Sequence, residues 1–370
     1  MKDFAGASVV FRVDASLQIG TGHVMRCLTL AAALKARGAQ CQFICRAHPG
    51  NLIGHIGRQG HPVSQLPAGV CDFQPAPGAA AHAAWLGCDG SSDAAQTVAA
   101  LDGHRPDWLV VDHYALDAAW EAVLREHAAR LFVIDDLADR DHRCDLLLDQ
   151  NLGRQAADYA GRVPTGCRVL AGPHFALLRP EFAELREYSL GRRAAPTLGH
   201  IMVTMGGIDR DNATAAVLKA LHHCDLPPTC RISVVMGAAA PWLADVRELA
   251  AQMPWPTELR VDVDDMARLM ADSNLAIGAA GATSWERCCL GLPSLLLVLA
   301  DNQRLSASAL AASGAAVLLG GASAAEQALP DALRRLLQGQ ALTQAAVAAG
   351  RVTDGQGVGR VVAEMGAIDG

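Results

Sequence analysis

The hydrophobic pattern of the chain opens with a strand, a helix and a second strand. Ser8–Val13 is a short apolar run with β-branched residues, which predicts a buried strand. Val24–Arg37 repeats apolar residues at helical spacing, and Gly38 stands where that helix is expected to stop. Gln40–Cys45 predicts the next strand. A strand, a helix and a strand in this order form a parallel pair with a right-handed crossover.

The same alternation continues and then restarts after a predicted linker. DWLVVDHY and RLFVIDD predict strands on either side of the helical stretch LDAAWEAVLREHA, and CDLLLDQNL predicts a further edge element. Tyr188–Gly199 has the composition of a linker, and beyond it HIMVTMGG, RISVVMG, LAIGAAG and PSLLLVLA predict strands, each followed by a helical pattern. We therefore expect an α/β fold of two doubly wound, Rossmann-like domains, residues 1–190 and 191–370, that face each other across a cleft. The segment after Gln338 is expected to be helical and to pack on either domain.

The amino-acid composition narrows the range of folds and partners that this pattern allows. With 370 residues and 51% hydrophobic composition, the chain is too large for one ordinary core, and only 4% aromatic residues favour α/β layers. The formal net charge of −7 and the lack of a basic run argue against a nucleic-acid partner. Eleven cysteines without a C-x-x-C pair predict reduced thiols in a cytoplasmic protein. No signal peptide or bilayer-spanning run is predicted, so we expect a soluble protein with no membrane partner. Leu66–Trp85, rich in Pro, Gly and Ala, is expected to be a loop or an insertion.

The loop after the first predicted strand, Gln18–Met25, carries the first candidate chemistry. In open parallel sheets, ligands bind beyond the carboxyl ends of the strands. Gly20 and Gly22 let the backbone approach a ligand, and the following helix directs free N–H groups towards it. The positive helix end disfavours a charged imidazole, which keeps His23 neutral and able to act as a general base. The spacing alone leaves a second interpretation open, in which His23 only caps the helix.

Two glycine-containing loops of the second half are candidate phosphate contacts. Gly206 and Gly207 lie between a strand and a helix, where they suit a phosphate, although this loop taken alone favours a plain tight turn. Gly281–Ser284 presents small side chains and backbone N–H groups at a helix start, which suits a diphosphate.

Three polar residues near these loops are candidate sugar contacts. Glu286 lies in the first turn of a predicted helix, where it either favours the helix dipole or accepts hydrogen bonds from ribose hydroxyls. Asn302 and Gln303 follow an apolar strand. Their amides suit sugar hydroxyls or acetamido groups, or simply cap a helix.

Two segments rich in ionisable residues are weaker candidates. Asp112–Tyr114 lies at a strand end and could face the cleft. Asp135–His142 holds carboxylates and a histidine, but their spacing matches no established ligand set, so a solvated loop is favoured over a metal site. The chain has no G-x-S-x-G elbow and no P-loop lysine.

Several stretches between Phe11 and Gln303 together resemble one family, the UDP-2,4-diacetamido-2,4,6-trideoxy-β-L-altropyranose hydrolases of pseudaminic acid biosynthesis. They are RVDASLQIGTGHVMRCLTLA, VVDHYALD, VIDDLADRDHRCDLLLDQN, LRPEF, VTMGGIDRDN and GATSWERCCLGLPSLLLVLADNQ. That family is similar in fold to the two-domain glycosyltransferases of the GT-B type. The resemblance therefore implies a GT-B-like arrangement of the two predicted domains.

The resemblance also implies a reaction and its residues. His23 would activate water for attack at the anomeric carbon, UDP would leave by C–O cleavage, and the configuration would invert without a metal or another cofactor. UDP would lie mainly on the C-terminal half, with the sugar reaching the N-terminal half. The expected substrate contacts are Gly20, Thr21, Gly22, Tyr114, Asn302 and Gln303, and the expected UDP contacts are Gly206, Gly207, Gly281, Ala282, Thr283, Ser284 and Glu286.

Two other functions remain open at this point. One is a UDP-sugar glycosyltransferase with the same architecture and an acceptor other than water; a transferase acting on membrane lipids would need an apolar, basic patch, and Lys35, Arg37 and Arg46 are scattered. The other is a non-catalytic subunit that binds a nucleotide sugar. The sequence leaves the stereochemistry of the sugar and the oligomeric state undecided.

Overall fold

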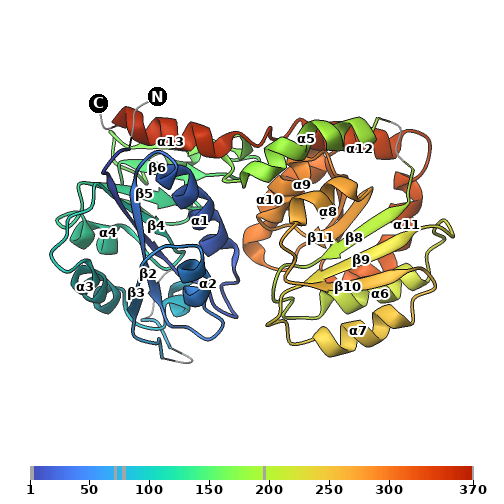
Figure 1. Ribbon diagram of the computed structural model, residues 1–370, viewed down its shortest axis with the longest axis horizontal. Coiled ribbons are helices and arrows are strands. Elements are labelled where there is room, and N and C mark those ends of the chain that lie inside the picture. The colour runs from blue at the N-terminus through green and yellow to red at the C-terminus, as the bar shows by residue number, and fades with distance from the viewer. Residues whose placement is uncertain (1–3, 71–72, 77–80, 195–196, 369–370) are drawn as a thin grey trace. The chain divides into compact units, whose positions relative to one another are not determined.

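The computed structural model describes residues 4–70, 73–76, 81–194 and 197–368, and the chain divides into two compact units. The first unit comprises Met1–Leu177 and Gly357–Gly370, and the second comprises Leu178–Gln356. Each unit is built on one parallel β-sheet with helices on both faces (Figure 1). The predicted α/β fold of doubly wound sheets is thereby confirmed.

The first unit has a seven-stranded sheet in the order β3-β2-β1-β4-β5-β6-β7. Its strands are β1 (Ser8–Val13), β2 (Gln40–Arg46), β3 (Val63–Leu66), β4 (Trp108–Asp112), β5 (Arg130–Ile134), β6 (Leu146–Asp149) and β7 (Arg168–Ala171). Its α-helices are α1 (Gly22–Lys35), α2 (Ile53–Arg58), α3 (Gly90–Leu101), α4 (Ala118–Leu124) and α13 (Gly357–Ile368). The predicted edge position of the β6 stretch is wrong, because β7 pairs in parallel on its outer side.

The alternation of side chains along β1 builds a core on each face of this sheet. Val9 and Phe11 join the cluster that includes residues of α1 and α13, whereas Val10 joins the cluster on the other face with residues of α3 and α4. The ring of Phe11 stacks on that of Phe43 in β2 at 4.8 Å. Both faces of β1 are therefore buried, which explains why its sequence is mostly apolar; the exception, Arg12, is buried and pairs with Asp14 and Asp93.

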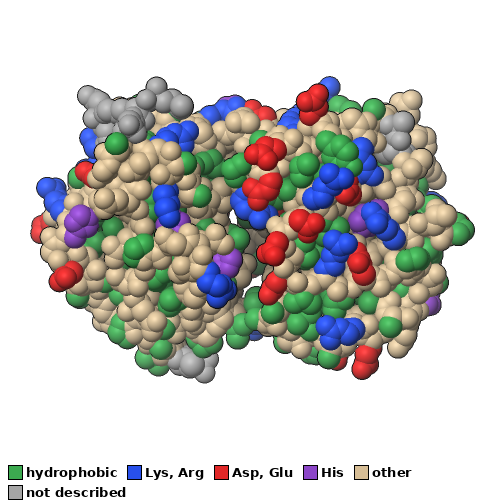
Figure 2. All heavy atoms as spheres, viewed as in Figure 1, with side chains coloured by type: hydrophobic (Ala, Val, Ile, Leu, Met, Phe, Trp, Pro, Cys, Tyr) green, Lys and Arg blue, Asp and Glu red, His purple; other side chains and the backbone are tan. Residues whose placement is uncertain are grey.

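The second unit has a six-stranded sheet in the order β10-β9-β8-β11-β12-β13. Its strands are β8 (His200–Thr204), β9 (Arg231–Met236), β10 (Thr257–Val261), β11 (Leu275–Ala279), β12 (Ser294–Leu297) and β13 (Ala316–Gly320). Its α-helices are α5 (Pro180–Arg192), α6 (Ala213–His222), α7 (Leu243–Ala251), α8 (Met266–Asp272), α9 (Thr283–Cys289), α10 (Arg304–Ala312), α11 (Ala325–Leu336) and α12 (Ala341–Gly350). On the face of this unit seen in Figure 2, basic and acidic side chains are interspersed.

The division between the units differs from the predicted one at two places. The expected boundary between residues 190 and 191 lies inside α5, which packs on α8 and α9 of the second unit. The first five residues of the predicted linker, Tyr188–Arg192, are therefore helical. The C-terminal segment is shared, since α12 packs in the second unit and α13 packs against α1 in the first.

Both sheets have a topological switch point, where the strand order reverses direction. It lies between β1 and β4 in the first unit and between β8 and β11 in the second. The loops that leave these neighbouring strands lead to opposite faces of the sheet, which opens a crevice at their carboxyl ends. Most of the residues singled out in the sequence follow one of these four strands.

Candidate active site

The loop between β1 and α1 is a tight turn held by Ser16. Its hydroxyl oxygen accepts the amides of Gln18 and Ile19, and its carbonyl accepts the amide of Gly20 at 2.8 Å. Gly20 has a φ of +80°, a backbone conformation that suits glycine. Thr21 is the N-cap residue and Gly22 the first residue of α1, so His23 lies in the first helical turn. The predicted glycine turn before the helix is confirmed.

His23 meets a buried carboxylate at the switch point of the first unit. Its Nδ1 lies 2.6 Å from Oδ1 of Asp112, the last residue of β4. Arg26, one helical turn further along α1, donates from Nε to Oδ2 and from Nη2 to Oδ1 of the same carboxylate, at 2.6 and 2.7 Å. Asp112 is fully buried and His23 is 8% exposed. The interpretation that His23 only caps the helix leaves this contact unexplained.

The charge state of Asp112 decides which imidazole nitrogen carries the proton. Burial alone would raise the pKa of Asp112, but Arg26 and His23 hold this pKa well below its usual range. An ionised carboxylate only accepts hydrogen bonds, so Nδ1 of a neutral His23 must be the donor. The lone pair then lies on Nε2, the nitrogen remote from Asp112. This is the tautomer that a general base requires.

A second carboxylate, Asp136, extends the network beyond β5. Its Oδ2 accepts from Nη1 of Arg26 and from the hydroxyl of Tyr114, both at 2.7 Å. Asn151 donates from Nδ2 to Oδ1 at 3.3 Å. Arg26 therefore has two carboxylate partners, and the cluster has one negative charge in excess that a protonated His23 would neutralise.

Tyr114 is also the centre of a group of aromatic rings. The ring of His23 contacts it edge-on at 4.6 Å, and the ring of Trp85 stacks on it at 5.6 Å. His82 lies 5.2 Å from Tyr114 and 4.5 Å from Trp85. Trp85 is the last residue of the predicted insertion, Leu66–Trp85. Residues 71–72 and 77–80 of this insertion lie outside the described residues. Sequence reasoning missed Trp85 and His82 because they stand in a stretch without periodic pattern.

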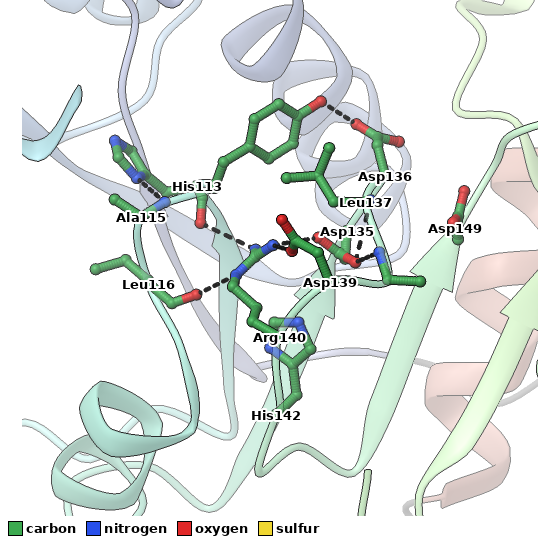
Figure 3. Close-up of polar contacts among 12 residues, drawn as sticks. His113, Ala115, Leu116, Asp135, Asp136, Leu137, Asp139, Arg140, His142 and Asp149 are labelled. Carbon is green, nitrogen blue, oxygen red and sulfur yellow. Dashed lines mark hydrogen bonds and ion pairs between the residues drawn. The ribbon is translucent and has the colours of Figure 1, made fainter. Parts of the chain in front are cut away.

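Several side chains of the acidic segment Asp135–His142 form hydrogen bonds within the first unit, as Figure 3 shows. Arg140 donates to Oδ1 of Asp135 at 2.7 Å and to the carbonyl of Leu116 at 2.8 Å. His142 pairs with the buried Glu121 at 2.7 Å. The expectation of a solvated loop is therefore wrong for Asp135, Arg140 and His142, which are buried. Among the described residues, no three His, Cys, Asp or Glu side chains are grouped so that they could hold a metal ion.

In the second unit, Gly206 and Gly207 follow β8 after one intervening residue, Met205. Gly206 has a φ of +88°, and the carbonyl of Gly207 accepts the amide of Gly237 at 3.0 Å. The carboxylate of Asp209 accepts the amides of Ala213 and Thr214, both at 2.9 Å. These two amides of α6 are thus already used within the loop.

The Gly281–Ser284 turn follows β11, the strand next to β8. The amide of Ser284 donates to the carbonyl of Gly281 at 2.9 Å, and Ser284 is buried. Gly281, Ala282 and Thr283 form the accessible part of the turn. Gln303 lies beside this turn, since a Cβ added to Gly281 would be 3.9 Å from its Nε2. Asn302 precedes it in a short 3₁₀ helix, Asp301–Gln303.

Glu286 is partly buried in the first turn of α9. Burial raises the pKa of Glu286 to about 7, which Arg179, with Nη2 4.0 Å from Oε1, only partly offsets. Its carboxylate is therefore ionised above neutral pH and protonated below. A carboxylate held in this way can accept hydrogen bonds from the hydroxyls of a ligand as soon as it loses its proton.

Known proteins resemble this chain in fold and in sequence. Its structure superposes on the crystal structure of Acinetobacter baumannii MurG with a TM-score of 0.69, at 17% identity, over 97% of this chain and 99% of that one. The chain has the GT-B fold. Residues 250–355 match the model of the glycosyltransferase family 28 C-terminal domain. These residues lie in the second unit and include the Gly281–Ser284 turn and Glu286.

Among curated proteins, the chain is 27% identical over 307 residues to the UDP-2,4-diacetamido-2,4,6-trideoxy-beta-L-altropyranose hydrolase of Campylobacter jejuni. The match covers 83% of this chain and 97% of that protein. The spore coat polysaccharide biosynthesis protein SpsG of Bacillus subtilis is 31% identical to this chain over 199 residues. That match covers 53% of this chain and 57% of SpsG. The resemblance seen in the sequence motifs is confirmed by the match to the Campylobacter jejuni hydrolase. No helix in the described part of the chain is long and apolar enough to cross a membrane.

Proposed function

We propose that this GT-B protein is a hydrolase that releases UDP from UDP-2,4-diacetamido-2,4,6-trideoxy-β-L-altropyranose, a step of pseudaminic acid biosynthesis. The observation that carries the proposal is the contact between Nδ1 of His23 and the ionised Asp112 at the switch point of the first unit. This contact supports His23 as a general base, and the similarity to a hydrolase of that name supports both the reaction and the substrate.

The reaction requires one proton acceptor and one stabilised leaving group. Nε2 of His23 takes a proton from water while the water oxygen bonds to the anomeric carbon. The bond from that carbon to the diphosphate oxygen breaks, its electron pair leaves with UDP, and the configuration inverts. Asp112 stabilises the imidazolium that forms, and the proton then passes to solvent. The products are the free sugar, UDP and one proton.

The substrate contacts of this proposal come from both units. In the first, Gly20, Thr21 and Gly22 let the backbone approach the sugar, and Tyr114, fixed by Asp136, lines it. In the second, Asn302 and Gln303 bind the acetamido groups or hydroxyls.

The nucleotide is assigned to the second unit. Gly206 and Gly207, together with the turn of Gly281, Ala282, Thr283 and Ser284, hold the diphosphate at the ends of β8 and β11. Glu286 accepts hydrogen bonds from the ribose. We also propose that turnover needs no metal, so a chelator is expected to leave the rate unchanged.

One assay tests the proposal. The protein is incubated with the UDP-diacetamido sugar in the absence of any acceptor, UDP release is followed, and NMR of the fresh product identifies the sugar and its anomer. Release of UDP with formation of the inverted free sugar is expected. Retention of configuration, or no release from this substrate, would contradict the proposed reaction.

The match to the family 28 C-terminal domain favours one alternative, a UDP-sugar glycosyltransferase. It predicts UDP release only after an acceptor is added. A non-catalytic binding subunit predicts binding without release under either condition.

A further inference from the structure

The second unit buries a guanidinium group directly below the Gly281–Ser284 turn. Arg287 of α9 is 1% exposed. Its Nη2 donates to the carbonyl of Ala279, the last residue of β11, at 2.7 Å and to the hydroxyl of Ser284 at 2.9 Å. The side chain of Arg287 therefore extends from α9 to the carboxyl end of β11.

Gly278 in β11 makes the space that this guanidinium occupies. A Cβ at Gly278 would overlap Nη1 of Arg287 and would lie 2.6 Å from the carbonyl oxygen of Thr204. Thr204 is the last residue of β8 and the register partner of Gly278. Glycine inside a strand is unfavourable unless something must approach the backbone closely. Arg287 is that group, and it lies at the switch point between β8 and β11.

The positive charge of Arg287 has no partner of opposite sign nearby. Its Nε and Nη1 have no hydrogen-bond partner, and no carboxylate lies within 4 Å of it, in the part of the chain that the structure describes. Burial lowers the pKa of Arg287 to about 10, so the group still carries its charge at neutral pH. The neighbouring Glu286 acts on it only at longer range and is partly protonated near neutral pH, because burial raises its own pKa to about 7.

A buried, uncompensated charge is strongly unfavourable, and natural proteins keep such features mainly at functional sites. An amide or hydroxyl side chain could donate to the same two oxygens without this penalty. The charge itself therefore requires an explanation. An anion bound on the accessible side of the turn, at Gly281, Ala282 and Thr283, would supply the missing negative charge. The helix dipole alone is a weak source of positive potential here, because α9 has only seven residues.

We propose that Arg287 is the counter-charge for the diphosphate of a nucleotide bound over the Gly281–Ser284 turn. This inference rests on the proposed function, in which that turn receives UDP. Arg287 is a positioning residue, since it is screened from solvent and acts through the hydroxyl of Ser284 and through its field in a low-dielectric interior. The same charge stabilises UDP as its negative charge grows during C–O cleavage, without a bound cation.

The test compares UDP with uridine, which lacks the phosphates, by calorimetric titration. Arg287→Met removes the charge and keeps most of the volume, whereas Arg287→Lys retains the charge. For Arg287→Met we expect roughly 10- to 100-fold weaker UDP binding, with uridine binding unchanged. Its Tm without ligand should be equal to or above that of the wild type, because the uncompensated charge is gone. Arg287→Lys should retain most of the UDP affinity.

A merely structural role gives a different pattern, in which Tm falls and UDP and uridine weaken together, or UDP binding stays unchanged. Either result would overturn the inference, as would a wild-type protein that binds no UDP. Should Arg287→Met fail to fold, Arg287→Gln serves instead, since it also removes the charge, with the same expected loss for UDP and none for uridine. Failure of the hydrolase proposal is distinguishable, because a wild-type protein that binds UDP but does not release it from the sugar leaves this comparison intact.

Discussion

The two switch points of the molecule are built on the same strand order but with opposite electrostatics. Between β1 and β4, every charge has a partner, since Arg26 bonds to Asp112 and Asp136 and His23 bonds to Asp112. Between β8 and β11, the turns carry small residues, and the guanidinium of Arg287 has no ion-pair partner among the described residues. A site that transfers a proton needs side chains held in place by hydrogen bonds to one another. A site that binds an anion needs a positive electrostatic potential and space for the ligand. This difference supports the proposal that the chemistry belongs to the first unit and nucleotide binding to the second.

The largest effect is expected from removing the imidazole of the first switch point. His23→Ala should lower kcat by about 10²–10⁴-fold, which is the usual contribution of a general base to the rate. UDP affinity, which belongs to the second unit in this assignment, should be unchanged by calorimetric titration. A variant that turns over near the wild-type rate would remove His23 from the mechanism, and one that loses UDP binding would break the division between the units.

Removing the charge that orients His23 should have the next largest effect. Asp112→Asn places an amide at Nδ1, which allows the wrong tautomer and takes away the carboxylate that stabilises the imidazolium. We expect kcat to fall about 100-fold with little change in KM, and the pH profile of kcat to shift. Asp93→Asn is the matched control, because Asp93 is also buried and pairs with Arg12 and Arg46 without contacting His23. Equal losses of kcat in both variants would reduce Asp112 to a structural role.

The strands that the sequence predicted and those that it missed differ by their place in the sheet. Mostly apolar strands such as Ser8–Val13 and Leu275–Ala279 were found because neighbouring strands and helices bury them. The missed strands are the four sheet edges, β3, β7, β10 and β13. The edge strand Thr257–Val261 has no fully buried residue and alternates polar with apolar side chains, so it carries no apolar run to detect.

The candidate site was predictable to a similar extent. The glycine turn and His23 were found from local spacing, and the end of β4 was marked by its position after an apolar run. The pairing of Arg26 with Asp112, 86 residues away, follows only from the strand order that brings β1 beside β4. An arginine within an apolar helical pattern was the available signal, because a buried guanidinium requires carboxylate partners.

Titration of Glu286 sharpens the assignment of the second unit. Its pKa of about 7 means that the carboxylate gains a proton as the pH falls from 8 to 6 and then accepts hydrogen bonds from ribose hydroxyls less well. KM for the UDP-sugar should therefore rise up to about tenfold over this interval, with uridine affinity falling in parallel. Glu286→Gln should flatten both dependences. A pH dependence that persists in this variant would assign the titration to another group.

The same shift predicts a stability change of defined sign. The folded state binds the Glu286 proton more tightly than the unfolded chain, so stability falls as the pH rises from the ordinary value of 4.5 to about 7. In Glu286→Gln this part of the pH dependence of Tm should disappear. UDP binding at pH 8 should restore part of the lost stability in the wild type.

The smallest expected effect concerns Trp85, which stacks on Tyr114 at the edge of the first switch point. If the sugar lies against Tyr114, Trp85→Ala should loosen this ring and raise KM for the UDP-diacetamido sugar about two- to tenfold, while Trp85→Phe should preserve most of the contact. UDP affinity should not change in either variant, since no part of the second unit is altered. A loss of UDP affinity in Trp85→Ala would contradict the separation of sugar and nucleotide contacts, and an unchanged KM would show that the aromatic group only supports the fold around His23.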